Sequence, residues 1–349
     1  MIKITTTLLL SFLLPFAIGS FVCAQEQSPV DYMEQIDKAE QEANQKYLAY
    51  VSAAAHSGRI KKVERMRQQL LDGIINSRNN LRGIPLYKGE KELRQSSIDY
   101  LDLLYHVFNE DYVKIVNIEE IAEQSFNEMQ AYLLLQEKTS EKLNDAQAKR
   151  NDASKKFAEK YNIRLLEEAS AMSEKMNKAA DVIKYRNGIY LLFFKCNWQW
   201  NEMNKTIQSS KVNDIEQARN AVMTYADEGL TSLGTLKGFD GDASLVNTCK
   251  QILNRYRLVA DKEVPGIITF ILASENFEKV KKSFDARPER ERKKQDVDQY
   301  NKAVEEMNAG VNRFNAANKS LYETNKDLVN LWQKTDKDFS DGHTPYFRR

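Results

Sequence analysis

Two cysteines are the residues of this chain most able to form a covalent link. Cys196 and Cys249 lie far apart in the sequence, in segments that both read as helical. An even pair of cysteines in an oxidising compartment can form a disulfide, and two buried free thiols are the alternative. Both interpretations remain open for this pair on sequence grounds.

Other residues with catalytic or metal-binding chemistry are few and widely spaced. The three histidines, His56, His106 and His343, form neither an i, i+4 His pair nor a Glu-x-x-His pattern, so zinc-protease and di-iron sites are not indicated. Haem-attachment, nucleophile-elbow and glycine-rich phosphate-binding sequences are absent. Adjacent acids at 119–120, 167–168 and 305–306 are typical of solvated helix faces. The sequence therefore predicts no catalytic residue, cofactor or metal.

The most apolar stretch after the N-terminal segment runs from Tyr190 to Trp200. Its large side chains, including Phe193, Phe194 and Trp198, cover most of the circumference of a helix. A helix that is apolar all round is normally buried in the centre of a bundle. The alternative is the lining of a pocket for an apolar molecule or lipid, held between helices near 190–200.

Charged residues form two further patterns, and both are read as solvated. Residues 287–294 are strongly basic but are interrupted by Glu289 and Glu291, which favours a solvated joint over a basic docking site. Glu64 and Arg67, like Glu216 and Arg219, have the i, i+3 spacing of surface ion pairs.

The N-terminus has the pattern of a secretory signal peptide. Lys3 precedes an apolar stretch from Leu8 to Val22, and small residues follow before polar Gln25. Cleavage is expected after Ala24, because the apolar stretch of roughly 15 residues is short of the roughly 20 needed for a membrane anchor. The protein is thus expected to be exported, to the periplasm or the cell surface of a bacterium.

Cys23 allows a second interpretation of the same segment. A lipoprotein signal also ends at a cysteine, which then carries the lipid anchor, but the residue before that cysteine is usually small and here it is Val22. Cleavage after Ala24 would leave a chain with 50 basic and 50 acidic residues. A neutral chain has no broad electrostatic reason to bind nucleic acid.

Helical signals dominate the rest of the chain, since only 13 glycines and 6 prolines interrupt 349 residues. Ser28, Pro29 and Asp31 are typical of a helix start. Apolar residues recur every three or four positions. The helices are predicted at about 29–57, 60–82, 91–108, 118–161, 165–209, 212–233, 243–261, 265–284 and 294–337, with a loop at 83–89, a turn or kink at 109–111, a possible break at Asn187–Gly188 and a tail from Asp338 to Arg349. The almost wholly charged stretch from Glu137 to Lys160 is predicted to project as a solvated arm.

An internal repeat relates two parts of the chain. A shift of 152 residues aligns 61–115 with 213–267, and an aromatic-x-Gly-acid sequence recurs at 87–90 and 239–242. This loop matters because helical periodicity cannot produce it. At the same shift Cys249 aligns with Ser97, and at a shift of 143 Cys196 aligns with Ala53.

The predicted fold is therefore all-α: an elongated bundle of long helices, built from two tandem copies of a three-to-four-helix unit. The signal peptide covers 1–24, the first unit 25–163, the second unit 164–337 and the tail 338–349.

The signal segment ending Val22-Cys23-Ala24-Gln25, the first helix start and the Gly83–Gly89 loop together resemble an uncharacterised family of exported, all-helical bacterial surface proteins. That resemblance implies no activity and no functional residue. The expected function is non-enzymatic: a structural or interaction protein that offers its helices to an envelope or surface protein partner. Binding of an apolar small molecule or lipid near 190–200 is the second hypothesis, and an enzyme is the third.

Overall fold

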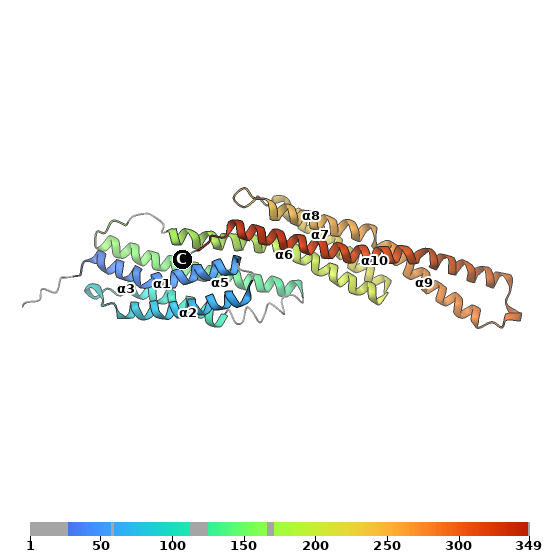
Figure 1. Ribbon diagram of the computed structural model, residues 1–349, viewed down its shortest axis with the longest axis horizontal. Coiled ribbons are helices and arrows are strands. Elements are labelled where there is room, and N and C mark those ends of the chain that lie inside the picture. The colour runs from blue at the N-terminus through green and yellow to red at the C-terminus, as the bar shows by residue number, and fades with distance from the viewer. Residues whose placement is uncertain (1–26, 57–58, 112–124, 166–170, 348–349) are drawn as a thin grey trace, which may run out of the picture.

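The computed structural model describes residues 27–56, 59–111, 125–165 and 171–347. Over these ranges the chain is almost entirely helical and forms an elongated bundle, so the predicted all-α fold is confirmed (Figure 1). The elements are α1 (Pro29–His56), α2 (Ile60–Gly83), η1 (Tyr87–Gly89), α3 (Glu92–His106), η2 (Val107–Asp111), α5 (Phe126–Lys160), α6 (Ala171–Ser209), α7 (Val212–Thr235), α8 (Ser244–Lys262), α9 (Val264–Asp285), η3 (Glu289–Glu291) and α10 (Lys294–His343).

The N-terminal part of the bundle consists of α1, α2, α3 and the second half of α5. Its first helix begins where predicted, because Asp31 N–H donates to Ser28 Oγ at 3.0 Å and Ser28 N–H donates to Asp31 Oδ2 at 3.2 Å. Tyr32, Ile36, Leu70 and Leu101 are fully buried in its core. The apolar face of each helix is thus covered by the other helices of this unit.

The C-terminal part consists of α6, α7, α8 and the second half of α10. These helices enclose a separate core around Trp200, Leu253, Tyr256 and Trp332. The stretch predicted as central, Tyr190–Trp200, lies within α6. Asn187 and Gly188 continue this helix without a break, so the possible interruption there was wrong.

A third, smaller cluster joins the two units. The first half of α5 places Met129 and Leu133 against Phe194 of α6, with Leu191 and Trp198 beside them. The second connection is polar: His56 at the end of α1 pairs with Asp341 of α10, Nδ1 to Oδ1, at 2.9 Å. The units therefore overlap in a staggered way along the rod (Figure 1).

A two-helix hairpin extends the rod beyond the second unit. It consists of α9 and the first half of α10, and it runs past the ends of α6, α7 and α8 (Figure 1). Gly310 permits the close approach of the two helices, because a Cβ at this position would lie 2.8 Å from Cδ2 of Phe270. Further along, Tyr300 stacks on Phe284 with ring centroids 4.6 Å apart.

Matching features recur at the repeat spacing of 152 residues. Helix α2 spans 60–83 and α7 spans 212–235. Lys88 and Gly89 have positive φ angles of 46° and 80°, and Asp240 and Gly241 have 50° and 88°. A positive φ is uncommon for residues other than glycine, yet Lys88 and Asp240 both have one. The same turn is thus built twice, 152 residues apart.

Two charge-based expectations are corrected by the packing. The stretch Glu137–Lys160 does not project as a solvated arm, because Ala153, Phe157 and Ala158 are buried against the first unit. The predicted Glu64–Arg67 ion pair forms, but Arg67 is buried rather than on the surface, and its Nη1 also donates to the Phe108 carbonyl at 2.7 Å. Arg219 donates to the Ala260 carbonyl and to Asp261.

The remaining differences concern helix ends. The turn at 109–111 belongs to the π-helical segment η2. Residues 338–343 continue α10 instead of forming a tail, because Phe339 is buried against Tyr185 and Phe239. The signal peptide with Cys23, Ala24 and Gln25, residues 118–124 and the acid pairs at 119–120 and 167–168 lie outside the described residues.

Candidate functional site

The two cysteines face the same core from different helices. Cys196 of α6 and Cys249 of α8 are free, fully buried thiols. Cys196 donates to the Val222 carbonyl and Cys249 to the Ile189 carbonyl. Burial raises the pKa of Cys249 to about 12, and burial, together with the neighbouring Cys249, raises the pKa of Cys196. Of the two alternatives for this pair, a disulfide or two buried free thiols, the structure has the free thiols.

This environment predicts the reactivity of both cysteines. In the folded protein, labelling by a maleimide at pH 8 is expected to be at least about a hundredfold slower than that of an exposed cysteine, because burial suppresses the thiolate. After denaturation of the mature chain, cleaved after Ala24, without reductant, mass spectrometry should find two labels per chain. Recovery of no label from the denatured, unreduced protein would instead establish a disulfide.

The apolar stretch of α6 is packed on several sides. Phe193 stacks on Trp332, with ring centroids 4.6 Å apart and planes 7° apart. Phe194 points to the other side, where it contacts the cluster formed with α5, and half-buried Trp198 lies beside it. A groove between α1 and α2 and a shallow hollow on α9 are lined by other residues. These side chains therefore have the surroundings of a filled core.

The histidines lie in three separate places, and each pairs with an acid. His106 contacts Glu110 at 3.0 Å on an exposed surface, and His343 contacts Asp242 at 2.9 Å at the turn between α7 and α8. Burial opposes the ionisation of Asp242, but hydrogen bonds from Ser244 and His343 hold the pKa of its carboxyl below the ordinary value. Within the described ranges, no three His, Cys, Asp or Glu side chains gather as metal ligands would.

No helix in the described ranges has both the length and the apolar character required to span a bilayer.

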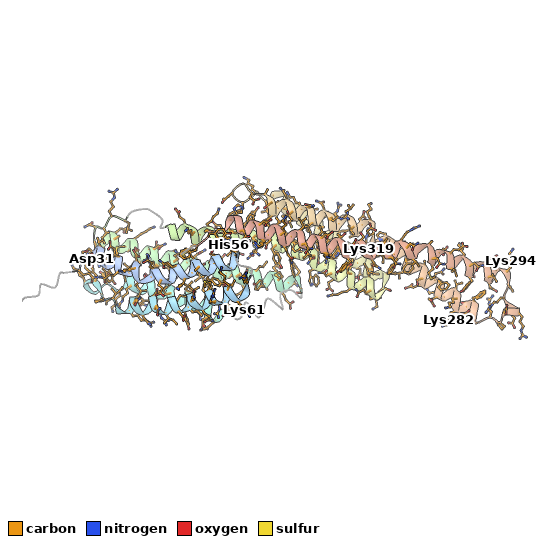
Figure 2. The ribbon with its side chains drawn as sticks, in the orientation of Figure 1. Asp31, His56, Lys61, Lys282, Lys294 and Lys319 are labelled. Atoms are coloured by element: carbon orange, nitrogen blue, oxygen red, sulfur yellow. The ribbon has the colours of Figure 1, made fainter. Side chains whose placement is uncertain are left out.

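The end of the α9–α10 hairpin carries the densest charge on an exposed part of the fold. Between Glu278 and Asp296 there are eight basic and five acidic residues. Lys282 and Lys294 mark this end of the rod, far from Asp31 of the first unit (Figure 2). We call residues 278–296 the hairpin tip.

The hairpin tip is held by its own contacts and leaves lysines available. Asp296 accepts from the Lys293 backbone N–H at 2.9 Å and pairs with Arg287, so the pKa of its carboxyl is lowered. Arg292 lies over the Phe284 ring, 4.2 Å from its centroid. Among the described residues, Lys279, Lys282 and Lys294 have no ion-pair partner. These ammonium groups are free to meet an acidic surface.

Sequence reasoning identified the 287–294 charge run but interpreted it as a solvated joint. The charge run itself was visible; its position at the end of a projecting hairpin was not, because that depends on the pairing of α9 with α10. The sequence also gave no indication of the junction around His56 and Asp341, which are 285 residues apart. No local pattern in the sequence connects those two residues.

Comparison with known proteins adds no relative to this geometry: no family model, curated protein or solved structure matches the chain.

Proposed function

We propose that this protein is a non-enzymatic interaction module of the bacterial envelope or cell surface, and that its hairpin tip contacts an acidic region of a protein partner. The observation that carries the proposal is the projection of α9 and α10 beyond the bundle, with Lys282 and Lys294 at their far end. In the described part of the chain, neither lysine has an ion-pair partner. A rigid two-helix extension holds these charges away from the rest of the chain, where a partner can reach them.

Two further observations support this role. The packing of Phe193 on Trp332 and of Phe194 on α5 favours an interaction protein over a carrier of an apolar molecule between helices near 190–200. Opposite charges on two proteins steer their encounter and add specificity. A basic tip on a chain whose mature form is neutral concentrates this effect at one end.

Export and duplication are part of the proposal. The N-terminal sequence supports secretion with cleavage after Ala24, and lipidation at Cys23 is the alternative that would tether the protein to a membrane. The recurring turns at 87–90 and 239–242 support two tandem copies of one helical unit. The resemblance to exported helical surface proteins fits the same picture.

Site-specific photo-crosslinking in intact cells tests the function. A crosslinking amino acid placed at Lys282 or Lys294 is expected to capture the same envelope protein, whereas one at Lys319, further along α10, should not (Figure 2). The double substitution Lys281→Glu and Lys282→Glu should lower the yield from position 294 about tenfold, and Lys319→Glu should leave it unchanged. Equal capture from position 319, or no capture from the tip, would refute the proposal.

A further inference from the structure

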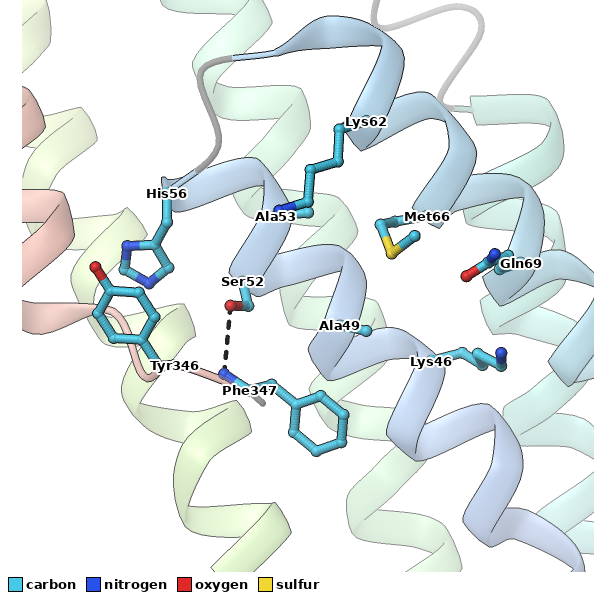
Figure 3. A pocket seen from close by; sticks show the side chains of 10 residues that line it. All are labelled: Lys46, Ala49, Ser52, Ala53, His56, Lys62, Met66, Gln69, Tyr346 and Phe347. Carbon is cyan, nitrogen blue, oxygen red and sulfur yellow. Dashed lines mark hydrogen bonds between the residues drawn. The ribbon is translucent and has the colours of Figure 1, made fainter. Parts of the chain in front are cut away.

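A groove crosses the first unit at its junction with the second. It lies between α1 and α2 and has a volume of about 530 Å³, within the range of about 300–1,000 Å³ typical of small-molecule sites. Its apolar surface is formed by Ala49, Ala53, Met66 and Phe347 (Figure 3). The sequence between Lys46 and His56 follows its length, about 15 Å along α1.

The C-terminal segment forms one wall of this groove. Phe347 N–H donates to Ser52 Oγ at 3.3 Å, and the Tyr346 ring stacks on His56 with centroids 3.7 Å apart and planes 8° apart (Figure 3). The wall is therefore fixed to α1 at two places. A residue from the end of the chain thus shapes a site on its first helix.

The polar residues of the groove include cations but no acid. Lys46 and Lys62 line it together with His56 and Gln69. Among the described residues, neither lysine has an ion-pair partner. The stem of Lys46 lies across Gly73, where a Cβ would approach its Cγ to 2.9 Å. Lys46 thus contributes its methylene groups to the groove, while Lys62 reaches over α1 near Ala53 (Figure 3).

His56 supplies an unsatisfied polar group at the Lys62 end. Its side chain is only 9% exposed, and its Nδ1 pairs with Asp341. The other ring nitrogen, Nε2, is buried and has no hydrogen-bond partner in the described structure. A buried polar atom without a partner is unfavourable. With Asp341 accepting from Nδ1–H, a ligand carboxylate would accept from Nε2–H, the donor that a doubly protonated ring supplies.

We propose that this groove binds an aliphatic carboxylate. The carboxylate would lie at the end formed by Lys62 and His56, and the hydrocarbon chain would lie on Ala49, Ala53, Met66 and Phe347 towards the stem of Lys46. The ammonium group of Lys62 selects the anion, and the apolar floor selects the chain. This site is separate from the hairpin tip, so either proposal can fail without the other.

Isothermal titration of the purified protein with decanoate tests the inference. Decanoate is expected to bind, and decanol, which lacks the charge, about tenfold more weakly, the loss of one charge-assisted hydrogen bond. Lys62→Met should weaken decanoate binding about tenfold, and Lys46→Met about threefold. The matched control is Lys61→Met, since Lys61 is exposed on α2 and does not line the groove.

Each other outcome would count against this site. Equal affinities for decanoate and decanol would show that the groove does not recognise the carboxylate. Unchanged decanoate binding in Lys62→Met, with circular dichroism showing an intact fold, would place the molecule elsewhere. Absence of decanoate binding to the unmodified protein would overturn the inference outright.

Discussion

Replacing Arg150 with methionine is expected to lower the free energy of unfolding by about 3 kcal/mol, because the change leaves a buried carboxylate without its partner. Arg150 lies on the second half of α5 with its side chain 15% exposed, and it reaches α1. Its Nη2 is 2.9 Å from Glu40 Oε2, and it also pairs with Asp37. Glu40 is only 5% exposed, so water cannot replace the lost guanidinium.

The consequences of this change can be separated from a general loss of charge. The matched control is Lys149→Met, one position away and exposed, which should change stability by less than about 0.5 kcal/mol. Adding Glu40→Met to Arg150→Met should recover most of the loss, since apolar residues of similar volume can replace a buried pair. Denaturant unfolding followed by circular dichroism measures all three. An Arg150→Met protein as stable as the unmodified chain would mean that the pairs of Arg150 with Asp37 and Glu40 contribute nothing to stability.

Arg150 also shows why the solvated-arm prediction was wrong. The prediction for residues 137–160 was based on their many charges. Apolar residues nevertheless recur there at intervals of three, seven and four, at Leu143, Ala146, Ala153 and Phe157. These intervals place them on one face of a helix. Small residues on that face allow close packing, and the long charged side chains beside them keep their charges at the edge. The periodicity was in the sequence, but composition outweighed it.

Other features followed directly from local sequence. Ser28, Pro29 and Asp31 predicted the first helix start because capping depends on neighbouring residues. The Gly89 and Gly241 turns were marked because an aromatic-x-Gly-acid sequence recurs at 87–90 and 239–242. By contrast, the groove needs α1, α2 and the C-terminal segment together. Its residues, from Lys46 to Phe347, carry no shared pattern, so only the tertiary arrangement could bring them to attention.

Arg67 and Arg219, which the shift of 152 residues aligns, should make unequal contributions to the free energy of unfolding. Each donates to a main-chain carbonyl 41 residues later, Phe108 at 2.7 Å and Ala260 at 3.0 Å. The side chain of Arg67 is 9% exposed and that of Arg219 is 21% exposed. We therefore expect Arg67→Met to cost about 2 kcal/mol and Arg219→Met about 1 kcal/mol, because a buried, unsatisfied carbonyl is penalised more. Denaturant unfolding measures both, with exposed Arg65→Met as the control. A loss of stability in only one of the two variants would contradict this prediction.

The pH dependence of the Arg67 contribution provides an independent check. Hydrogen bonds from Arg67 and Gln68 lower the pKa of Glu64 from 4.5 to about 2. A lowered folded-state pKa stabilises the fold above the unfolded value, and this stabilisation is lost as the pH falls from about 4.5 through 2. The Glu64 side chain is 44% exposed, so the pH-dependent part should be on the order of 1 kcal/mol. The stability difference between the unmodified protein and Arg67→Met should therefore shrink over that interval.

In NMR titrations, the Glu64 carboxyl should titrate near its ordinary pKa in Arg67→Met. If the difference were constant with pH, the Arg67–Glu64 contact would contribute nothing to stability, and the effect of Arg67 would come from its bond to the Phe108 carbonyl in η2.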